Sequence, residues 1–139
     1  MADAESVLDA SALLAYLGGE PGDDLVADAI AGGATIFTVN LAEALSTLAS
    51  RGADPAEVSE GLAERGLLGG AITVLPFTDA DAVEAARLRP LTRKIGLSLG
   101  DRACLALGRR LSAPVLTADV AWARLKLDVD VRSIRETMR

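Results

Sequence analysis

Histidine is absent from the 139 residues, and cysteine occurs once, at Cys104. A chain without histidine cannot use an imidazole general base, a Ser-His-Asp or Cys-His mechanism, or a His-ligated metal. The single cysteine excludes an internal disulfide and a Cys-rich zinc site. These absences remove more chemistry than any single motif adds.

Aromatic residues are also scarce, since the chain has two Phe, one Trp and one Tyr, although half of its residues are apolar. The core must therefore come from Ala, Leu and Val, which suits helices packed closely on a small sheet. The length favours one domain over residues 1–139. The start lacks a basic segment, and no uncharged stretch is long enough to cross a membrane, so we expect a cytoplasmic protein without a signal peptide or membrane span.

Charge is unevenly distributed along the chain, whose net charge is −6. Residues 1–86 carry fifteen acids against Arg51 and Arg65, whereas residues 87–139 carry twelve Lys or Arg against five acids. Ordinary helix-surface charge would account for this distribution. The alternative is a basic surface for a polyanion that lies beside an acidic site.

Strand and helix patterns alternate along the sequence. Short apolar or β-branched segments predict strands at 6–9, 35–39, 72–75, 115–116 and 129–131. Helical periodicity and capping residues predict helices at 10–17, 24–31, 40–50, 54–66, 78–89 and 98–111, with a short one after Asp119 that includes Trp122 and Leu125. Such alternation implies an α/β fold, a parallel sheet with helices on both faces.

Four acids follow strands or begin helices in this pattern, and each has a purely structural explanation. Asp9 and Asp119 are plausible helix caps. Glu43 follows Asn40, and Asp101 follows Ser98, with the spacing of a capping box. In a parallel α/β fold, however, strand carboxyl ends and helix N-termini share one edge of the sheet. We therefore expect the four carboxylates to converge.

Converging carboxylates would repel one another and raise each other's pKa unless a cation were bound. Oxygen ligands without His or Cys suit a hard ion, Mg²⁺ or Mn²⁺. Helix N-termini around the ion would favour phosphate oxygens. An acidic cluster, a hard metal and a neighbouring basic segment together indicate phosphodiester hydrolysis, in which the metal supplies hydroxide and stabilises transition-state charge.

These residues resemble the PIN-domain family of metal-dependent nucleases, and more closely its VapC-type toxin ribonucleases. The matching segments are LDASAL at Asp9, NLAE ending at Glu43, RPLTRKIGLSLGDRACLALG around Asp101 and LTADVAW around Asp119. The resemblance implies a PIN-like three-layer fold with about five parallel strands, a Mg²⁺ or Mn²⁺ site, and endoribonuclease activity. It also implies a homodimer and a cognate antitoxin. Asn40 stands where Ser or Thr is common, and Val120 replaces a residue that is often basic.

The resemblance also gives roles to individual residues. Asp9 and Asp101 would ligate the metal directly or through water, and Asp119 would complete the site or hold a second ion. Glu43 would ligate or orient the attacking water and take its proton. Residues that would support the metal site from behind are Ser11, Asn40 and Thr117. Candidates for RNA backbone contacts are Arg87, Arg89, Arg93, Lys94 and Arg102.

Other functions stay open at this point. A phosphoacceptor domain of the receiver type also places acids at strand ends, although Glu5 and Lys126 lie away from the positions expected of its second acid and its lysine. A D-x-D-x-T phosphatase requires Asp at position 11, which is Ser. A PIN scaffold could also act as a non-catalytic binding module. The sequence does not indicate which RNA is cut.

A partner surface is expected at residues 54–70. The predicted helix at 54–65 and the Gly/Leu segment at 66–70 carry more apolar surface than a small sheet can cover. We therefore expect an antitoxin or a second copy of the chain to bind there.

Overall fold

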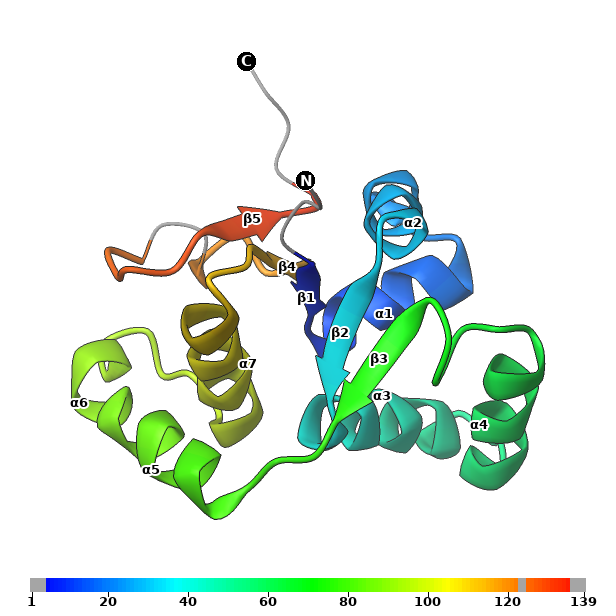
Figure 1. The fold of residues 1–139 in the computed structure, drawn as a ribbon, viewed down its shortest axis with the longest axis horizontal. Coiled ribbons are helices and arrows are strands. Elements are labelled where there is room, and N and C mark those ends of the chain that lie inside the picture. Colours follow the sequence, from blue (N-terminus) through cyan, green and yellow to red (C-terminus); the bar gives the residue numbers. More distant parts are fainter. Residues whose placement is uncertain (1–4, 123–124, 136–139) are drawn as a thin grey trace.

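Five parallel strands form one sheet in the computed structural model, which describes residues 5–122 and 125–135 (Figure 1). The order across the sheet is β3-β2-β1-β4-β5. The strands are β1 (Ser6–Leu8), β2 (Ala34–Phe37), β3 (Ile72–Leu75), β4 (Val115–Thr117) and β5 (Val131–Ser133). The predicted parallel α/β fold is therefore confirmed. The last strand lies two residues later than expected.

Helices follow the strands along the chain. They are α1 (Ala10–Gly18), α2 (Asp23–Ala31), α3 (Thr38–Ser50), α4 (Pro55–Glu64), α5 (Asp79–Arg87), α6 (Arg89–Thr92) and α7 (Leu99–Leu111). Local capping chemistry sets several of their starts. Asp9 accepts the Ala12 N–H at the start of α1, and Thr78 and Ser98 begin α5 and α7 with complete capping boxes. These side chains satisfy N–H groups that the first helical turn leaves without backbone partners.

The structure corrects three of the sequence-based boundaries. Helix α3 begins at Thr38, two residues before the expected start, so the predicted Asn40–Glu43 capping box is wrong. The helix expected at 78–89 ends at Arg87, and Pro90 lies in the first turn of the separate helix α6, where its missing N–H is tolerated. After Asp119 the chain forms a turn and adopts a 3₁₀-helical conformation at Trp122, whereas Leu125, which was expected in the same helix, is not helical. Residues 123–124 lie outside the described part.

Two apolar clusters lie on opposite faces of the sheet. One face is covered by α1 and α2, with Leu13, Val26 and Ile30 buried against it. The other is covered by α7 and α5, with Leu105 and Leu88 in its core. Figure 1 shows these layers, and it shows α3 crossing the lower end of the strands. Strand β2 is buried along its whole length because it lies between two strands and between both helical layers.

No helix within the described ranges is both long enough and apolar enough to cross a membrane.

Candidate active site

The four predicted acids line one pocket at the carboxyl edge of the sheet. Its volume is about 290 Å³, and its lining residues are Asp9, Ala10, Ser11, Leu14, Glu43, Thr47, Asp101, Asp119 and Trp122. The parallel fold brings them together because β1 and β4 end where α1, α3 and α7 begin. Trp122 is 1% exposed and belongs to the apolar cluster beneath α7.

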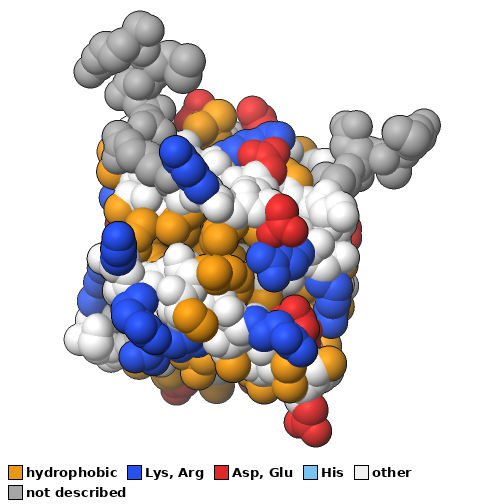
Figure 2. Space-filling model, turned by 90° about the vertical axis from the view of Figure 1, so that its left-hand side faces the viewer, with side chains coloured by type: hydrophobic (Ala, Val, Ile, Leu, Met, Phe, Trp, Pro, Cys, Tyr) orange, Lys and Arg blue, Asp and Glu red, His pale blue; other side chains and the backbone are white. Residues whose placement is uncertain are grey.

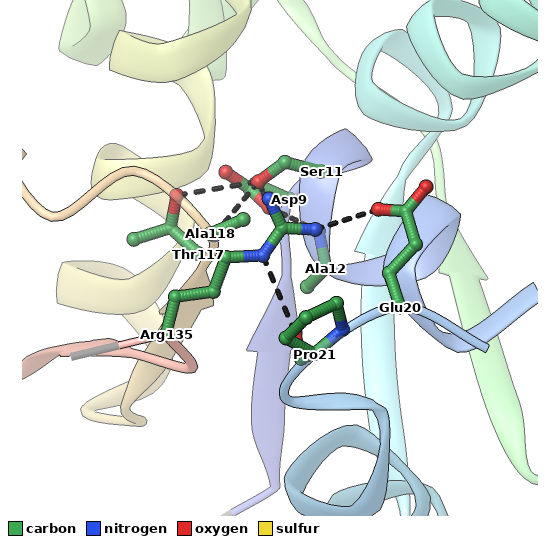
Figure 3. A network of polar contacts seen from close by, with 8 residues as sticks. All are labelled: Asp9, Ser11, Ala12, Glu20, Pro21, Thr117, Ala118 and Arg135. Carbon is green, nitrogen blue, oxygen red and sulfur yellow. Dashed lines mark hydrogen bonds and ion pairs between the residues drawn. The ribbon is translucent and has the colours of Figure 1, made fainter. Parts of the chain in front are cut away.

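Hydroxyl groups hold Asp9 at the end of β1. The Ser11 hydroxyl donates to Asp9 Oδ1 at 2.7 Å, and the Ala12 N–H donates to the same oxygen at 2.7 Å. Ser11 Oγ also accepts the Ala118 N–H and lies 3.4 Å from Thr117 Oγ1 (Figure 3). Ser11 and Thr117 thus join the ends of β1 and β4 behind the Asp9 carboxylate.

The same close-up shows a second link between distant segments. The Arg135 guanidinium pairs with Glu20 at 2.6 Å and donates to the Pro21 carbonyl (Figure 3). This pair ties the chain after β5 to the turn between α1 and α2. Since both charged side chains are more than one-third exposed, its contribution to stability is small.

Two of the acids hold their protons more tightly than usual. Burial raises the pKa of Asp9 from 3.8 to about 6, against the lowering effect of the Thr117 and Ser11 hydroxyls, and the Asp101 charge raises it further. Burial and the Asp101 charge also raise the pKa of Glu43, against the lowering effect of Asn40. Asp101 therefore acts electrostatically on both carboxylates. Burial, with the charges of these acids, raises the pKa of the Cys104 thiol, so this thiol stays protonated and unreactive.

Asp101 and Asp119 also make the capping contacts that the sequence suggested. Asp101 Oδ2 accepts the Ser98 N–H at 3.0 Å, and the Asp101 N–H donates to Ser98 Oγ. Asp119 Oδ1 accepts the Ala121 N–H at 2.8 Å. Each carboxylate thus uses one oxygen to accept a backbone N–H. A hydrogen bond to the local backbone and a place in the pocket are therefore compatible for the same residue.

Glu43 lies between α3 and α7. Asn40 Nδ2 donates to Glu43 Oε1 at 3.3 Å and to the Gly100 carbonyl oxygen at 3.0 Å. Asn40 is 1% exposed, and its amide therefore joins the two helices inside the protein. Asn40 supports Glu43 from within the same helix, one turn away, rather than from the helix cap.

The donor set fits a hard divalent cation in its chemistry. The pocket offers four carboxylates, and no His, Cys or Met is among its lining residues. Burial first, and the Asp101 charge second, raise the pKa values of Asp9 and Glu43, and a bound cation would oppose both effects by favouring the ionised carboxylates. Among the residues that the structure describes, however, no three acids or thiols lie close enough together to form a ready-made metal site. Direct ligation of one ion by three of the carboxylates would therefore require them to move closer together, whereas ligation through water would not.

The predicted RNA-contact residues divide into two groups. Arg87, Arg89, Arg93 and Lys94 are exposed around α6. Arg102 is only 8% exposed, and its guanidinium donates to the Ala85 carbonyl oxygen at 3.0 Å. The predicted RNA contact of Arg102 is therefore wrong, because its side chain lies between α7 and α5 and cannot reach a phosphate.

Two residues beside the acids were not predicted from the sequence. Thr47 lines the pocket, and it lies one turn after Glu43, a spacing that puts both on one face of α3. Gly100 contacts the Glu43 carboxylate, although the two are 57 positions apart. The helical spacing from Glu43 could have indicated Thr47, whereas no pattern in the sequence indicates the contact between Gly100 and Glu43.

Comparison with known proteins relates this fold to others. No curated protein matches the sequence. FitAcB from Neisseria gonorrhoeae is similar in structure, with a TM-score of 0.69, 20% identity, and coverage of 93% of this chain and 97% of that one. VapBC2 from Rickettsia felis, bound to a promoter DNA fragment, has a TM-score of 0.66, 14% identity, and coverage of 92% and 97%. A toxin-antitoxin complex from Klebsiella pneumoniae has a TM-score of 0.67, 13% identity, and coverage of 95% and 99%.

These structural similarities, all at low identity, concern the fold. The sequence itself is more specific, because the family model of the PIN domain matches residues 6–127, which contain all four acids of the pocket. The chain therefore belongs to the PIN domain family.

Proposed function

We propose that the protein is a Mg²⁺- or Mn²⁺-dependent endoribonuclease and the toxin of a toxin-antitoxin pair, similar to VapC. The observation that carries the enzymatic part is the pocket that Asp9, Glu43, Asp101 and Asp119 line together. Membership of the PIN family supports a nuclease and argues against the receiver-type alternative. RNA rather than DNA as the substrate follows from the resemblance to VapC-type toxins.

Asp9, Asp101 and Asp119 would hold the cation, and Glu43 would contribute to its binding through the attacking water. Ser11 and Thr117 would keep Asp9 in place. The chemistry that a bound cation supplies is Lewis-acid stabilisation of the charge that develops on the phosphate. Glu43 accepts the proton of the water that attacks phosphorus. Its raised pKa makes it a better proton acceptor than an ordinary carboxylate. The bond from phosphorus to the 3′ oxygen breaks, and that oxygen takes a proton from solvent.

The test is incubation of the purified protein with RNA and Mg²⁺ or Mn²⁺. We expect products with 5′-phosphate and 3′-hydroxyl ends, and we expect EDTA to stop cleavage. Sequencing of the RNA ends identifies both the chemistry and the site that is cut. Products with 2′,3′-cyclic phosphate, or cleavage that survives chelation, would contradict the metal mechanism. Absence of any cleavage would favour a PIN scaffold that only binds.

The antitoxin is the second part of this proposal. Structures with the same fold include toxin-antitoxin complexes, which supports such a partner here. A groove of about 410 Å³ lies between α1, α3 and α4, and its lining residues are Tyr16, Leu17, Leu48, Val58, Leu62, Arg65 and Leu67. We propose that an apolar segment of the antitoxin occupies this groove, and that a basic antitoxin side chain lies near the acids. Toxin, antitoxin and RNA would meet in the cytoplasm.

The exposed apolar surface lies elsewhere than expected. No large apolar side chain of residues 54–70 is exposed, since Leu62 is buried and Val58, Leu67 and Leu68 are half-buried. Four of the seven large apolar side chains that are exposed in the described part of the chain instead lie on α5, on α6, in the loop after α6 and at the start of α7. They are Val83, Leu91, Ile95 and Leu99, between 41% and 62% exposed. We call these four residues the α5–α7 surface.

We propose that two copies of the chain pack through the α5–α7 surface. Figure 2 shows hydrophobic side chains in the middle of this side of the molecule and Lys and Arg side chains around them. The basic margin would bring like charges together in a homodimer, so added salt should strengthen it. Arg87, Arg89, Arg93 and Lys94, at that margin, are proposed to contact RNA phosphates.

Two matched variants separate these surfaces. Val58→Arg places a charge in the groove, and Leu91→Arg places the same charge on the α5–α7 surface. We expect Val58→Arg to weaken antitoxin binding at least roughly tenfold and to keep the dimer, because a buried unpaired charge costs more than 1 kcal/mol. Leu91→Arg should give a monomer that still binds the antitoxin. Light scattering and titration with the antitoxin measure the two effects, and a monomeric wild type would contradict the dimer.

A further inference from the structure

Gly100 lies where a side chain would meet the Glu43 carboxylate. A Cβ at this position would be 2.5 Å from Glu43 Cδ and closer still to both carboxylate oxygens. Real Cβ atoms essentially never come within 3.0 Å of another heavy atom. The Glu43 carboxylate therefore occupies the space that the missing side chain leaves. Because this carboxylate ends a flexible side chain, it would be the part that moves if a Cβ were added.

Backbone conformation does not explain this glycine. Gly100 is the second residue of α7, and it is not among the glycines with positive φ. Alanine is compatible with such a helical position and is ordinarily favoured there over glycine. Gly19, by contrast, ends α1 at a φ of 63°, where the left-handed conformation itself favours glycine. The role of Gly100 is thus to leave space.

Asn40 fixes the position of the Glu43 carboxylate relative to Gly100. Its Nδ2 group donates both to Glu43 Oε1 and to the carbonyl oxygen of Gly100. Since Asn40 and Gly100 are both buried, the amide holds α3 against the first turn of α7. The Glu43 carboxylate is consequently kept beside Asp101, the next residue of α7, whose charge acts on it.

We propose that Gly100 is a positioning residue for Glu43: the absence of a side chain at position 100 lets the carboxylate lie against the start of α7, where Asn40 holds it. This proposal rests on the proposed function for the role of Glu43 in metal binding and cleavage. The effect of a methyl group at position 100 on melting temperature, Mn²⁺ affinity and cleavage must then depend on the side chain at position 43.

The experiment compares Gly100→Ala, Glu43→Ala and the double variant with Gly61→Ala. Gly61 is the matched control, because it also lies inside a helix, α4, and a Cβ there would have no neighbour within 4 Å. Three quantities are measured for each protein: the melting temperature in EDTA, the Kd for Mn²⁺ by calorimetry, and the rate of RNA cleavage. The melting temperature reports the contact without any metal or substrate.

We expect Gly100→Ala to fold. Its affinity for Mn²⁺ and its rate of RNA cleavage should each be about 10–100-fold lower than those of the wild type, as is usual when support for a metal ligand is lost. In the Glu43→Ala background, the same change should alter Mn²⁺ affinity less than twofold. There it should raise the melting temperature by about 2–4 °C, because alanine favours the helix once the carboxylate is gone. Gly61→Ala should give a similar rise and leave Mn²⁺ binding and cleavage unchanged.

Different failures have different meanings. Wild-type Mn²⁺ affinity and cleavage in Gly100→Ala would overturn the proposal and leave the nuclease function intact. Additive melting temperatures in the double variant would overturn the contact itself. A wild-type chain that neither binds Mn²⁺ nor cleaves RNA would refute the proposed function, and Gly100 would then position a carboxylate that has no catalytic role.

Discussion

Replacing Asp101 with Asn is expected to reduce RNA cleavage by at least roughly 10²-fold, the cost of losing one group that stabilises transition-state charge. The same change should remove most of the stabilisation by metal. A ligand that binds only the folded state contributes about 2.7 kcal/mol at a hundredfold excess over its Kd. For a chain of this size that equals roughly 6–14 °C in melting temperature. The wild type should show this rise with Mn²⁺, and the variant little of it.

The variant should nevertheless keep its fold. Asp101 Oδ2 accepts the Ser98 N–H in the capping box of α7, and the amide oxygen of Asn can accept the same hydrogen bond. The substitution also removes a charge that raises the pKa of Asp9 and of Glu43. We therefore expect the metal-free variant to be as stable as the wild type or more so. If Asp101 acted only as a cap, the variant would instead be slightly less stable and fully active.

Asp81→Asn provides a control at the same helical position. Asp81 closes the capping box of α5, as Asp101 does in α7, and it does not line the pocket. It also pairs with Arg110 at 3.0 Å, so this variant should lose stability. Its cleavage and its rise in melting temperature with Mn²⁺ should be unchanged. If the wild type and Asp101→Asn have the same melting temperature both with and without Mn²⁺, the acids do not form a metal site.

Replacing Asp9 with Asn should stabilise the metal-free protein, and the gain should depend on pH. The pKa of Asp9 is about 6 in the folded protein, against 3.8 for an ordinary Asp. Between these values the folded state binds a proton that the unfolded state has released, so wild-type stability falls as pH rises. This loss in the free energy of unfolding of the wild type is complete above about pH 6 and amounts to about 3 kcal/mol at most. Asn does not titrate, and it can still accept the Ala12 N–H.

Urea denaturation in EDTA between pH 4 and pH 8 measures this effect. The stability difference between Asp9→Asn and the wild type should be small at pH 4 and largest at pH 7 to 8. Asp54→Asn is the control, because Asp54 caps α4 at an exposed position outside the pocket. The free energy of unfolding of Asp54→Asn should change with pH as that of the wild type does. A constant difference for Asp9→Asn across the range would refute the linkage to its ionisation.

In Mn²⁺ the order of stabilities should reverse. Carboxylates bind a metal in their ionised form, so the affinity of the wild type should rise as pH increases through about 6. The stabilisation by Mn²⁺ should then exceed what the wild type loses by keeping a buried charge. Destabilisation without metal and stabilisation with metal are thus expected from the same side chain.

Local sequence determined much of the fold. The β-branched and apolar segments, the caps at Asp9, Thr78 and Ser98, and the alternation of strands with helices predicted the parallel sheet. These features act between residues that are close in sequence, so their pattern can be read without the fold. The meeting of the four acids also followed, because all parallel strands end at one edge.

Packing between distant segments decided the rest. Arg102 is buried against Ala85, Asn40 lies inside α3 and reaches Gly100, and Gly100 gives space to Glu43. The burial of a long side chain, or the room for a carboxylate, depends on which helix lies beside it and at what distance. The α5–α7 surface is exposed for the same reason, since no other described element covers it. The sequence by itself thus determined which acids meet at the edge of the sheet. Only the tertiary structure decided that Gly100 leaves room for Glu43 and that Arg102 is buried, because both depend on how helices distant in sequence pack.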